Sequence, residues 1–462
     1  MTLASLFRAR TMSALPHGSV RRRLAGGMFW TTVGSVLGQG VVAAGSIVLA
    51  RMLGKDGFGQ YGILQSTIGM FAIFAGLSMG YVASKHVAES ILTDTDKGRT
   101  GRVIGLSLLV AGVAGFLLTA TLAVGAQPFA RRFLGSDDLA GALRIASPIL
   151  LFGAVTGVQR GVLAGLEQFR AQNILMTAIA IVTVALTTLG AWLADLPGAM
   201  WGSMIGAALS LLGLTLVYNR ALGRAGIPVH FQGTWRERRL LWTLAIPAVL
   251  NGLMVAPVIW VTNAILVNSP GGYGEMGLFN AANQWRTILM YVPTIVLTPL
   301  LPIMMQLHAA KQYHQLRRVL LKTLGLSVGA VGCIALGFSL FAPQIMRLYG
   351  SGFASGTNVF YLIMLVSVLL SAGVVVGGLL SSTGAMWTGF LFNSVWAAVM
   401  IGTAIVVVPR HGALGLALAY AVAYSIHTII QFLYFWVYVR KSDAPASITP
   451  YPNDPAEERP WG

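Results

Sequence analysis

Long, nearly uncharged apolar runs are the feature that most restricts what this chain can fold into. Runs of about 20 residues cross a hydrocarbon core of about 30 Å as helices. Such runs lie near residues 28–50, 61–83, 103–125, 141–163, 173–193 and 199–218, and near 240–267, 277–302, 322–342, 358–380, 385–408 and 412–438. Because a segment in lipid must satisfy its own backbone hydrogen bonds, the pattern predicts twelve transmembrane helices in two groups of six.

Composition excludes a soluble protein. Only 10% of the 462 residues are charged and 56% are apolar, whereas a soluble domain carries about 25% charged residues. The formal net charge is +17, which in a soluble protein would raise the question of nucleic acid. Here the basic residues lie between apolar runs, so we predict no nucleic-acid partner.

The distribution of basic residues predicts the orientation in the membrane. Cytoplasmic loops collect Lys and Arg, and one side of the predicted helices holds 23 of the 31 basic residues against 7 on the other. The first run is longer than the 7–15 apolar residues of a cleavable signal peptide, so we expect an uncleaved first helix. We predict a multi-pass protein of the bacterial inner membrane with both termini cytoplasmic.

The hydrophilic segments divide the chain into parts. We predict a basic cytoplasmic segment (1–27), an N-lobe of six helices (28–218), a cytoplasmic linker (219–239), a C-lobe of six helices (240–440) and a tail (441–462). The tail is rich in Pro and polar residues, which disfavours a packed fold, so we expect it to be disordered.

The two halves carry matching short motifs. GFGQYGILQ from Gly57 matches GYGEMGLFN from Gly272, about 215 residues later. Three further matches at nearly the same offset join RGVLAGLEQF to GGLLSSTGAM, Pro-Gly-Ala to His-Gly-Ala, and two Phe-Ala pairs. Six helices per half is an even number, so the sequence predicts a parallel internal repeat, as in transporters that bind substrate between two bundles.

Three segments carry a resemblance to a known family. They are LARMLGKDGFGQYGILQ (49–65), RGVLAGLEQFR (160–170) and GLFNAANQWRTILMYVPTIVLTPLLP (277–302). They resemble the polysaccharide-transporter branch of the multidrug/oligosaccharidyl-lipid/polysaccharide exporter superfamily, the group of Wzx-type O-antigen and exopolysaccharide flippases. The resemblance covers residues 23–440 approximately. It implies at least twelve helices in two lobes and a lipid diphosphate sugar as cargo.

One basic residue is not explained by topology. Arg286 lies nine residues past Gly277, about 14 Å into the membrane at 1.5 Å per residue. Charges at that depth are costly and usually face a cavity. A guanidinium there could pair with a pyrophosphate through charge-assisted hydrogen bonds, or it could instead tie helices together through backbone carbonyls.

Amides and hydroxyls surround Arg286 at helical spacing. Asn280, Asn283, Gln284, Thr287 and Tyr291 form one polar stripe, with Arg286 at its flank. Together with Gln39 of the first helix and Asn263 of the seventh, they form the candidate substrate-binding set. Amides suit sugar hydroxyls because they both donate and accept, although in membranes such groups often only hold helices together.

Other residues support weaker hypotheses. Lys85, Arg160 and Arg170 lie at the predicted cytoplasmic surface, where they could meet incoming phosphate or bind anionic lipid. His427 and Gln431 could form a proton relay or an interhelical hydrogen bond. Cys333, the only cysteine, is interpreted as a small core residue. Five prolines of the seventh and eighth runs mark a candidate hinge: Pro247, Pro257, Pro293, Pro299 and Pro302.

Missing features narrow the function. Every Asp and Glu lies in a predicted loop, helix end or tail, whereas a cation-coupled drug exporter normally needs a carboxylate in the bundle. The outward connectors are short, and the sequence has no GxSxG, metal-ligand cluster or Walker motif. We therefore predict no catalytic residues, cofactor or metal, and an energy source that is either the membrane potential or Na⁺.

These observations predict a flippase that moves a polyprenyl-(pyro)phosphate-linked oligosaccharide from the cytoplasmic to the outer leaflet by alternating access. The oligosaccharide would be a repeat unit of O-antigen, capsule or exopolysaccharide. Its partners would be that lipid-linked oligosaccharide, membrane lipids, and a polysaccharide polymerase and chain-length regulator. The alternatives are a lipid II flippase, a multidrug exporter and, from another class, a membrane polysaccharide polymerase or ligase.

Overall fold

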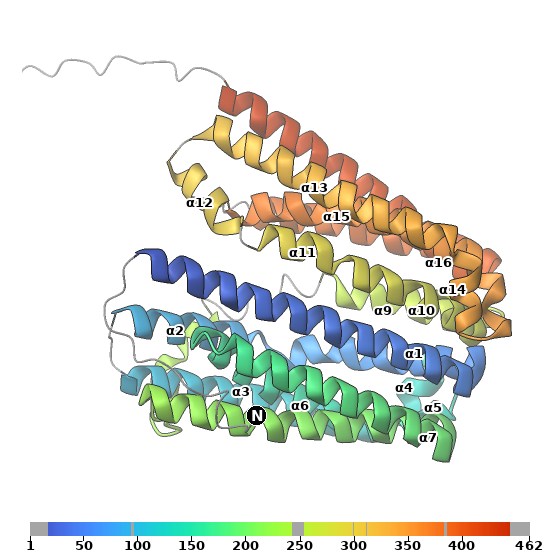
Figure 1. The fold of residues 1–462 in the computed structure, drawn as a ribbon. Helices are drawn as coiled ribbons and strands as arrows, with labels where there is room; N and C mark the ends of the chain where they lie inside the picture. The colour runs from blue at the N-terminus through green and yellow to red at the C-terminus, as the bar shows by residue number, and fades with distance from the viewer. Residues whose placement is uncertain are drawn as a thin grey trace, which may run out of the picture.

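The computed structural model describes residues 17–93, 97–242, 254–298, 300–310, 312–382 and 386–443. Within these ranges the regular structure is helical and no strand occurs. The helices form two groups, one made by the first half of the chain and the other by the second half (Figure 1). The predicted all-α membrane class in two lobes is confirmed.

The first group, the N-lobe, is followed in the chain by a short 3₁₀ turn, η3 (Thr234–Glu237). Its elements are α1 (His17–Gly76), α2 (Met79–Thr93), α3 (Lys97–Val124), α4 (Ala126–Phe129), η2 (Ala130–Leu134), α5 (Leu139–Ala146), α6 (Pro148–Gly165) and α7 (Phe169–Ala225).

The second group is the C-lobe. Its elements are α9 (Ala256–Val267), α10 (Gly272–Leu289), α11 (Tyr291–Leu297), α12 (Leu301–Ala309), α13 (Tyr313–Leu340), α14 (Ala342–Leu348), η5 (Ser351–Gly356), α15 (Thr357–Ser382) and α16 (Met386–Asp443).

Three helices are too long to cross a membrane once. α7 has 57 residues, about 86 Å at 1.5 Å per residue, which is more than twice the hydrocarbon core. It is broken at Asp195, α1 at Gly54 and α16 at Gly412, where the backbone leaves the helical region. Each therefore supplies two spans. Seven stretches of the described chain are long and apolar enough to span, and with these breaks, α9 and α10–α12 they account for the predicted twelve.

Both lobes repeat one order of elements, as the sequence repeat predicts. α3 is followed by the short α4, and α13 by the short α14. Each lobe then ends in a long helix that reverses direction at one break, Asp195 in α7 and Gly412 in α16. The close approach of Gly190 to the backbone of Gly198, and of Gly415 to that of Val407, shows that the two spans of each long helix pack side by side.

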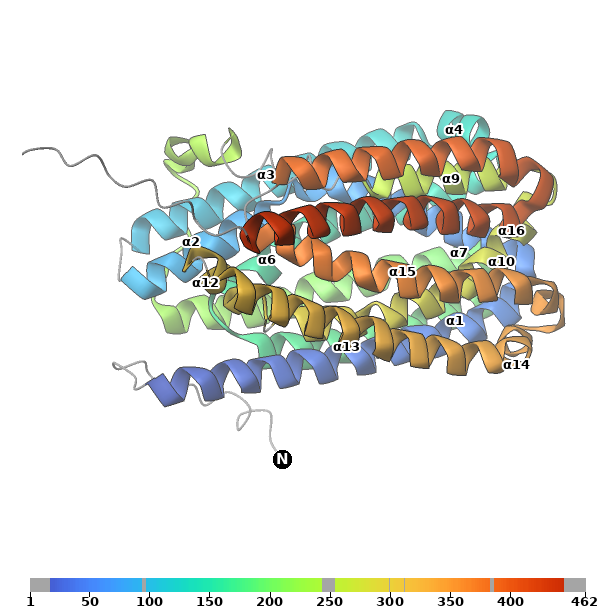
Figure 2. The same ribbon diagram turned by 90° about the horizontal axis from the view of Figure 1, so that it is seen from above.

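The two ends of the bundle carry different connections, and the basic residues Lys97, Arg99 and Arg170 lie at one of them. The end that carries the α2–α3 and α6–α7 connections and the segment after α7 is called the basic end here, and the end that carries the three breaks is called the opposite end. In Figure 1 the ribbons of the two lobes lie close together at the opposite end and spread apart toward the basic end. Figure 2 shows the same long, parallel stack of helices from above.

The eighth span is interrupted where prolines occur. It consists of α10, α11 and α12, with Pro293 in the first turn of α11 and Pro302 in the first turn of α12. Proline removes a backbone donor and tolerates only the first turn of a helix, so the breaks follow from the sequence. Pro247 and Pro299 of the predicted hinge lie outside the described residues.

The segment after α7 lies along the N-lobe. α7 continues to Ala225, beyond the predicted start of the linker at residue 219. The following segment, 226–242, packs closely on α3. A Cβ at Gly101 or Gly105 would overlap the backbone oxygen of Pro228 or His230, so only glycine allows this approach. Glu237, 11% exposed, pairs with Arg99 (3.3 Å) and Arg102 (3.7 Å) of α3.

Two expectations are changed by the fold. Cys333 is exposed on α13 rather than buried, because an apolar run in a membrane protein faces lipid as readily as protein, and hydropathy does not separate the two. α16 continues to Asp443, past the predicted start of the tail at residue 441. The remainder of the tail and residues 1–16 lie outside the described residues.

Candidate functional site

The polar stripe on α10 and α11 faces the first helix of the other lobe. Asn280 lies against Gly62, where a Cβ would overlap its side-chain nitrogen. About one turn of helix beyond Thr287, the Tyr291 hydroxyl accepts a hydrogen bond of 2.7 Å from Gln39 Nε2. Gln39, Asn280 and Tyr291 therefore lie along the lobe interface, and their role in binding substrate stays a prediction.

Arg286 lies at the flank of this stripe and is half-buried. Its Nε donates a 2.6 Å hydrogen bond to Asn283 Oδ1, and its guanidinium carbon lies 5.6 Å from the centre of the Tyr420 ring on α16. Among the described residues no carboxylate lies within ion-pair distance of it. The positive charge is thus held by a neutral amide and an aromatic face, and a guanidinium has five N–H groups to offer.

Buried polar residues continue from Arg286 along α16. Tyr420, Tyr424, His427 and Gln431 follow one another at helical spacing, and neighbouring rings lie 6.0 Å and 6.5 Å apart. Within the described structure, His427 Nε2 and Gln431 Oε1 are both buried without a hydrogen-bond partner. The predicted interhelical hydrogen bond through these two atoms is therefore not formed, and a relay role stays a hypothesis.

Tyr420 and Tyr424 were not predicted from the sequence. Tyr420 is 1% exposed and Tyr424 is 7% exposed, so both are part of the C-lobe interior beside Arg286. Their spacing with His427 and Gln431, at i, i+4, i+7 and i+11, is the signal that could have identified a polar stripe in the twelfth span.

Asn263 lies in another part of the interface. Its Nδ2 donates to Ser66 Oγ at 2.9 Å, and the neighbouring Trp260 Nε1 donates to Thr67 Oγ1 at 3.0 Å. Both bonds join α9 to the second span of α1. The neighbouring Thr262 donates instead to the carbonyl of Ile259 in its own helix. Asn263 thus connects the lobes and is not among the contacts of Arg286.

The lobes are sealed together toward the opposite end. Arg51 Nε donates to the carbonyl of Leu348 (2.6 Å) and Asn268 Nδ2 to that of Phe133 (2.8 Å). Tyr273 donates its hydroxyl to the carbonyl of Leu134. We call these bonds, with the glycine contacts of α1 and α10, the seal.

Glycine makes the seal possible. A Cβ at Gly59 would overlap the carbonyl of Tyr273, and a Cβ at Gly277 would overlap the carbonyl of Lys55. Both glycines belong to the repeated motifs, which therefore meet face to face across the two lobes. A larger side chain at either position would separate the backbones.

The predicted entrance residues lie at the basic end. Lys85 of α2, Arg160 of α6 and Arg170 of α7 all have exposed side chains. Lys85 forms only a long pair with Glu89, 3.9 Å, in which both side chains are about half exposed. Such an exposed pair contributes little stability, so Lys85 remains accessible to an anion.

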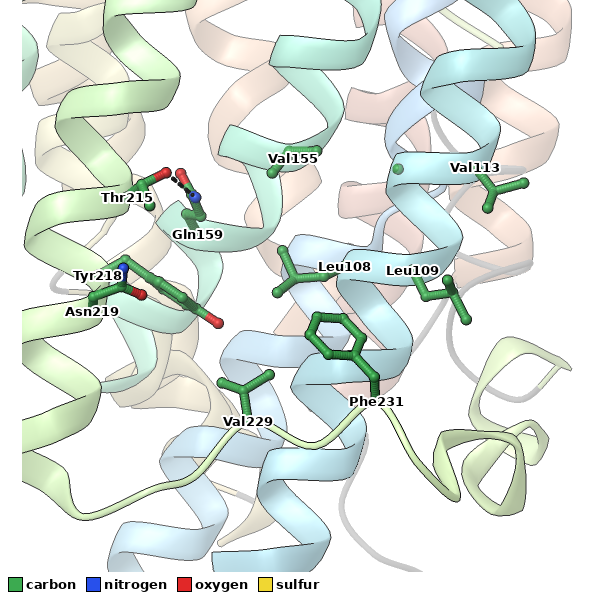
Figure 3. Close-up of a pocket in the computed structure, with 11 residues that line it drawn as sticks. Leu108, Leu109, Val113, Val155, Gln159, Thr215, Tyr218, Asn219, Val229 and Phe231 are labelled. Carbon is green, nitrogen blue, oxygen red and sulfur yellow. Dashed lines mark hydrogen bonds between the residues drawn. The ribbon is translucent and has the colours of Figure 1, made fainter.

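A pocket lies away from Arg286, on the N-lobe. It has a volume of about 550 Å³ and lies between α3, α6, α7 and the segment after α7 (Figure 3). No residue of the predicted set lines it. Within the described part of the chain, no group of three or more His, Cys, Asp or Glu could hold a metal.

Comparisons with known proteins agree with this architecture. A family model described as "Polysaccharide biosynthesis protein" matches residues 24–308, more than half of the chain. The EPS I polysaccharide export inner membrane protein EpsE of Ralstonia nicotianae is 26% identical over 410 residues, which cover 86% of this chain and 90% of the relative.

Two solved structures share the fold. An inward-facing multidrug resistance MATE family transporter of the MOP superfamily has a TM-score of 0.74 at 15% identity, covering 88% of this chain and 96% of its own. An outward-facing MATE family transporter has a TM-score of 0.66 at 14% identity, covering 90% and 96%. At these identities the likeness concerns the fold.

Proposed function

Since this chain belongs to the polysaccharide biosynthesis protein family, we propose that it flips a polyprenyl-(pyro)phosphate-linked oligosaccharide from the cytoplasmic to the outer leaflet of the inner membrane. At a coarser level it is a multi-pass inner-membrane transporter associated with polysaccharide export, with a MOP superfamily fold. The lipid-linked cargo, its site and its direction of movement are our proposal.

The observation that carries the proposal is the uncompensated charge of Arg286. A half-buried guanidinium with a neutral partner leaves N–H groups in a region of low dielectric. A diphosphate would supply both the missing charge and the missing acceptors through short, charge-assisted hydrogen bonds. A cationic drug would be repelled by the same charge.

The amides beside Arg286 suit the sugar part of such a cargo. Asn280, Gln284 and Gln39 carry both donors and acceptors, and two of them meet the facing lobe in this structure. We propose that they exchange these contacts for sugar hydroxyls when the lobes part. Asn263, which contacts Ser66 in another part of the interface, would act as a lobe contact that breaks during the cycle.

The contacts between the lobes support a state that is closed at the opposite end. The seal lies at the opposite end, and the lobes spread apart toward the basic end (Figure 1). From the positive-inside rule we propose that the basic end is cytoplasmic and that this conformation receives cargo from inside. The higher TM-score with the inward-facing transporter supports this.

The exposed basic residues of the basic end complete the route. Lys85, Arg160 and Arg170 would attract the diphosphate before it reaches Arg286, by raising its local concentration. After flipping, the oligosaccharide faces outward, which is where a polymerase and a chain-length regulator would act on it. We propose those two proteins as partners in the pathway.

A head-group protection assay tests the proposal. Purified protein is reconstituted with a labelled polyprenyl-diphosphate oligosaccharide, and an impermeant reagent reports the fraction of sugar that changes leaflet. We expect Arg286→Met to slow flipping by about 10- to 100-fold, the range of hydrogen bonds to a charged group. Arg286→Lys should fall between, because lysine keeps the charge but loses the fork.

Matched arms make the outcome specific. Arg347→Met removes an exposed arginine of the opposite end and should leave the rate unchanged. Lipid II and a cationic drug replace the oligosaccharide lipid in parallel vesicles. Normal flipping by Arg286→Met at an equal protein level would remove Arg286 from the site, and transport of the drug alone would overturn the proposed cargo.

A further inference from the structure

The pocket on the N-lobe is a groove between two helices. Its walls are Leu109 and Val113 of α3 on one side and Thr215 and Tyr218 of α7 on the other, with α6 as its floor. Figure 3 shows Val229 and Phe231 of the segment after α7 lying across the end near Tyr218. The groove is largely apolar, and Leu109, Val113 and Phe231 are exposed on the outer surface.

Two polar groups in this groove lack hydrogen-bond partners. Gln159 is 4% exposed and Tyr218 is 5% exposed, and neither Gln159 Oε1 nor the Tyr218 hydroxyl has a partner among the described residues. Gln159 Nε2 donates to Thr215 Oγ1 at 2.8 Å, so its oxygen is the atom left over. Figure 3 shows the Tyr218 hydroxyl directed toward Phe231 and Leu108, into the pocket.

Unpaired buried polar atoms destabilise a protein unless a ligand or water satisfies them. Gln159 Oε1 requires a donor, whereas the Tyr218 hydroxyl can donate to an ester or phosphate oxygen. Both residues line the pocket together with Val229 and the exposed Phe231. A ligand that carries hydroxyl groups as well as acceptor oxygens would satisfy both.

The depth of these groups matches the polar part of a lipid. Gln159 lies six residues before Gly165, the end of α6, and Tyr218 lies seven residues before Ala225, the end of α7, which is about 9–10 Å at 1.5 Å per residue. The head-group layer is about 5–8 Å thick, so both groups lie just below it, near the ester and glycerol oxygens of a lipid. Leu109 and Val113 lie farther from the basic end, at the depth of acyl chains.

The segment beyond Phe231 is built like a membrane-surface element. Phe231, Trp235 and Trp242 are 60%, 58% and 74% exposed, as aromatic residues at the lipid–water boundary are. Arg236 and Arg238 are exposed among them. Each basic side chain at a membrane surface attracts anionic lipid, so the charge beside the groove favours an anionic head group.

We propose that this groove binds an anionic phospholipid with a hydroxylated head group, of the phosphatidylglycerol type. One acyl chain lies along Leu109 and Val113, a head-group hydroxyl donates to Gln159 Oε1, the Tyr218 hydroxyl donates to an ester or phosphate oxygen, and Arg236 and Arg238 bind the phosphate. Because Glu237 holds the same segment on α3, the lipid would fasten the connection between the two lobes to the N-lobe. The site is separate from Arg286 and does not depend on the identity of the cargo.

Native mass spectrometry of the full chain tests the site. The protein is titrated in detergent with phosphatidylglycerol, phosphatidylethanolamine or phosphatidylcholine, and the singly bound fraction gives each affinity. We expect phosphatidylglycerol to bind at least about tenfold more tightly than phosphatidylcholine, and Arg236→Gln with Arg238→Gln to remove that preference. Gly112→Leu, whose side chain would enter open space in the groove, should weaken binding by about tenfold or more.

Two controls keep the test decisive. Gly337→Leu on α13 also enters open space but lies in the other lobe, and should leave binding unchanged. Tyr218→Phe keeps the packing and should weaken binding by about fivefold, the value of one hydrogen bond. The proposal fails if Gly112→Leu and Tyr218→Phe both bind phosphatidylglycerol like the parent protein, or if phosphatidylcholine binds equally well.

Discussion

The second span of α1 and the helix α10 are equivalent in the internal repeat, yet they differ at the position of the charged residue. Their motifs begin at Gly57 and Gly272, and each places glycines against the backbone of the other helix. Fourteen residues after each start, α10 carries Arg286 and α1 carries Phe71. Three residues earlier, α10 carries Asn283 and α1 carries Ile68.

The surroundings of the two positions differ as much as the residues. Arg286 is held by Asn283 and by the Tyr420 ring, whereas the Phe71 ring lies 5.7 Å from that of Phe129. The duplicated parts thus preserve the contact between lobes, and the charge occurs in only one of them. A duplicated scaffold can therefore close symmetrically although only one of the two repeats carries a charged group.

The contact that both repeats make is tested most strongly at the seal. Gly59→Val would force the α1 backbone away from Tyr273. Overpacking costs about 1–3 kcal/mol or more, so the sealed state should lose up to about 100-fold in population. We expect a cysteine at Ser66, in a Cys333→Ser background, to react much faster with an impermeant maleimide added from outside.

A matched variant separates crowding from the seal. Gly69→Val lies on the same span, where an added Cβ meets no neighbour, and should leave the reactivity at residue 66 unchanged. Equal labelling of the two valine variants would show that Gly59 is not required for closure.

The asymmetric part is tested by moving the charge. Phe71→Arg combined with Arg286→Phe keeps the composition but places the guanidinium beside Phe129, without an amide at the position of Asn283. We expect flipping to stay at least about tenfold below the parent rate in proteoliposomes, because the hydrogen bond to a charged group is lost. Adding Ile68→Asn should restore part of the rate. Full activity of the double variant would show that only depth matters.

A third difference lies at the start of the twelfth span. Glu275 Oε2 accepts the backbone N–H of Ala413 at 2.7 Å, next to the break at Gly412, and the repeat-equivalent residue of the N-lobe is Gln60. We expect Glu275→Ala to lower the free energy of unfolding by about 1.5–3 kcal/mol, seen as a lower melting temperature in detergent. Gln60→Ala should change the melting temperature far less; equal losses would mean that the cap has no special weight.

The smallest effect is expected where the lobes meet at mid-depth. Tyr291→Phe removes the acceptor of Gln39 Nε2, a neutral hydrogen bond worth about 0.5–1.5 kcal/mol. Labelling at residue 66 should rise by about two- to tenfold, because one contact of the sealed state is gone. Tyr61→Phe, whose hydroxyl accepts from Gln65 within the same lobe, is the control, and an equal rise there would assign the effect to general loosening.

The candidate site was predictable in part. Helical spacing placed Asn280 and Tyr291 on one face, and the repeat placed that face toward the other lobe, where Gly62 and Gln39 meet it. Asn263 was grouped with the same site but lies against Ser66. Spacing along one helix gives the direction of a side chain, whereas the pairing of helices depends on the packing of the whole bundle.

The features that the sequence did not predict have a common physical cause. Tyr420, Tyr424 and the groove beside Tyr218 lie in apolar spans, where hydropathy predicts depth but not whether lipid or protein covers a side chain. Cys333 was wrongly assigned to the core for the same reason. The docking of segment 226–242 on α3 depends on the close approach at Gly101 and Gly105, and glycines of that kind look like any other glycine in a transmembrane run.

The sequence by itself determined the twelve helices, their division into two repeats and the charge within the eighth span at residue 286, because the cost of polar groups in lipid is set by residue type and run length. Only the tertiary structure decided which end of the lobe interface is sealed, which neutral groups hold Arg286 and where a groove opens on the N-lobe. Those features depend on contacts between helices far apart in the chain, and van der Waals packing between such helices leaves no periodic signal in either one.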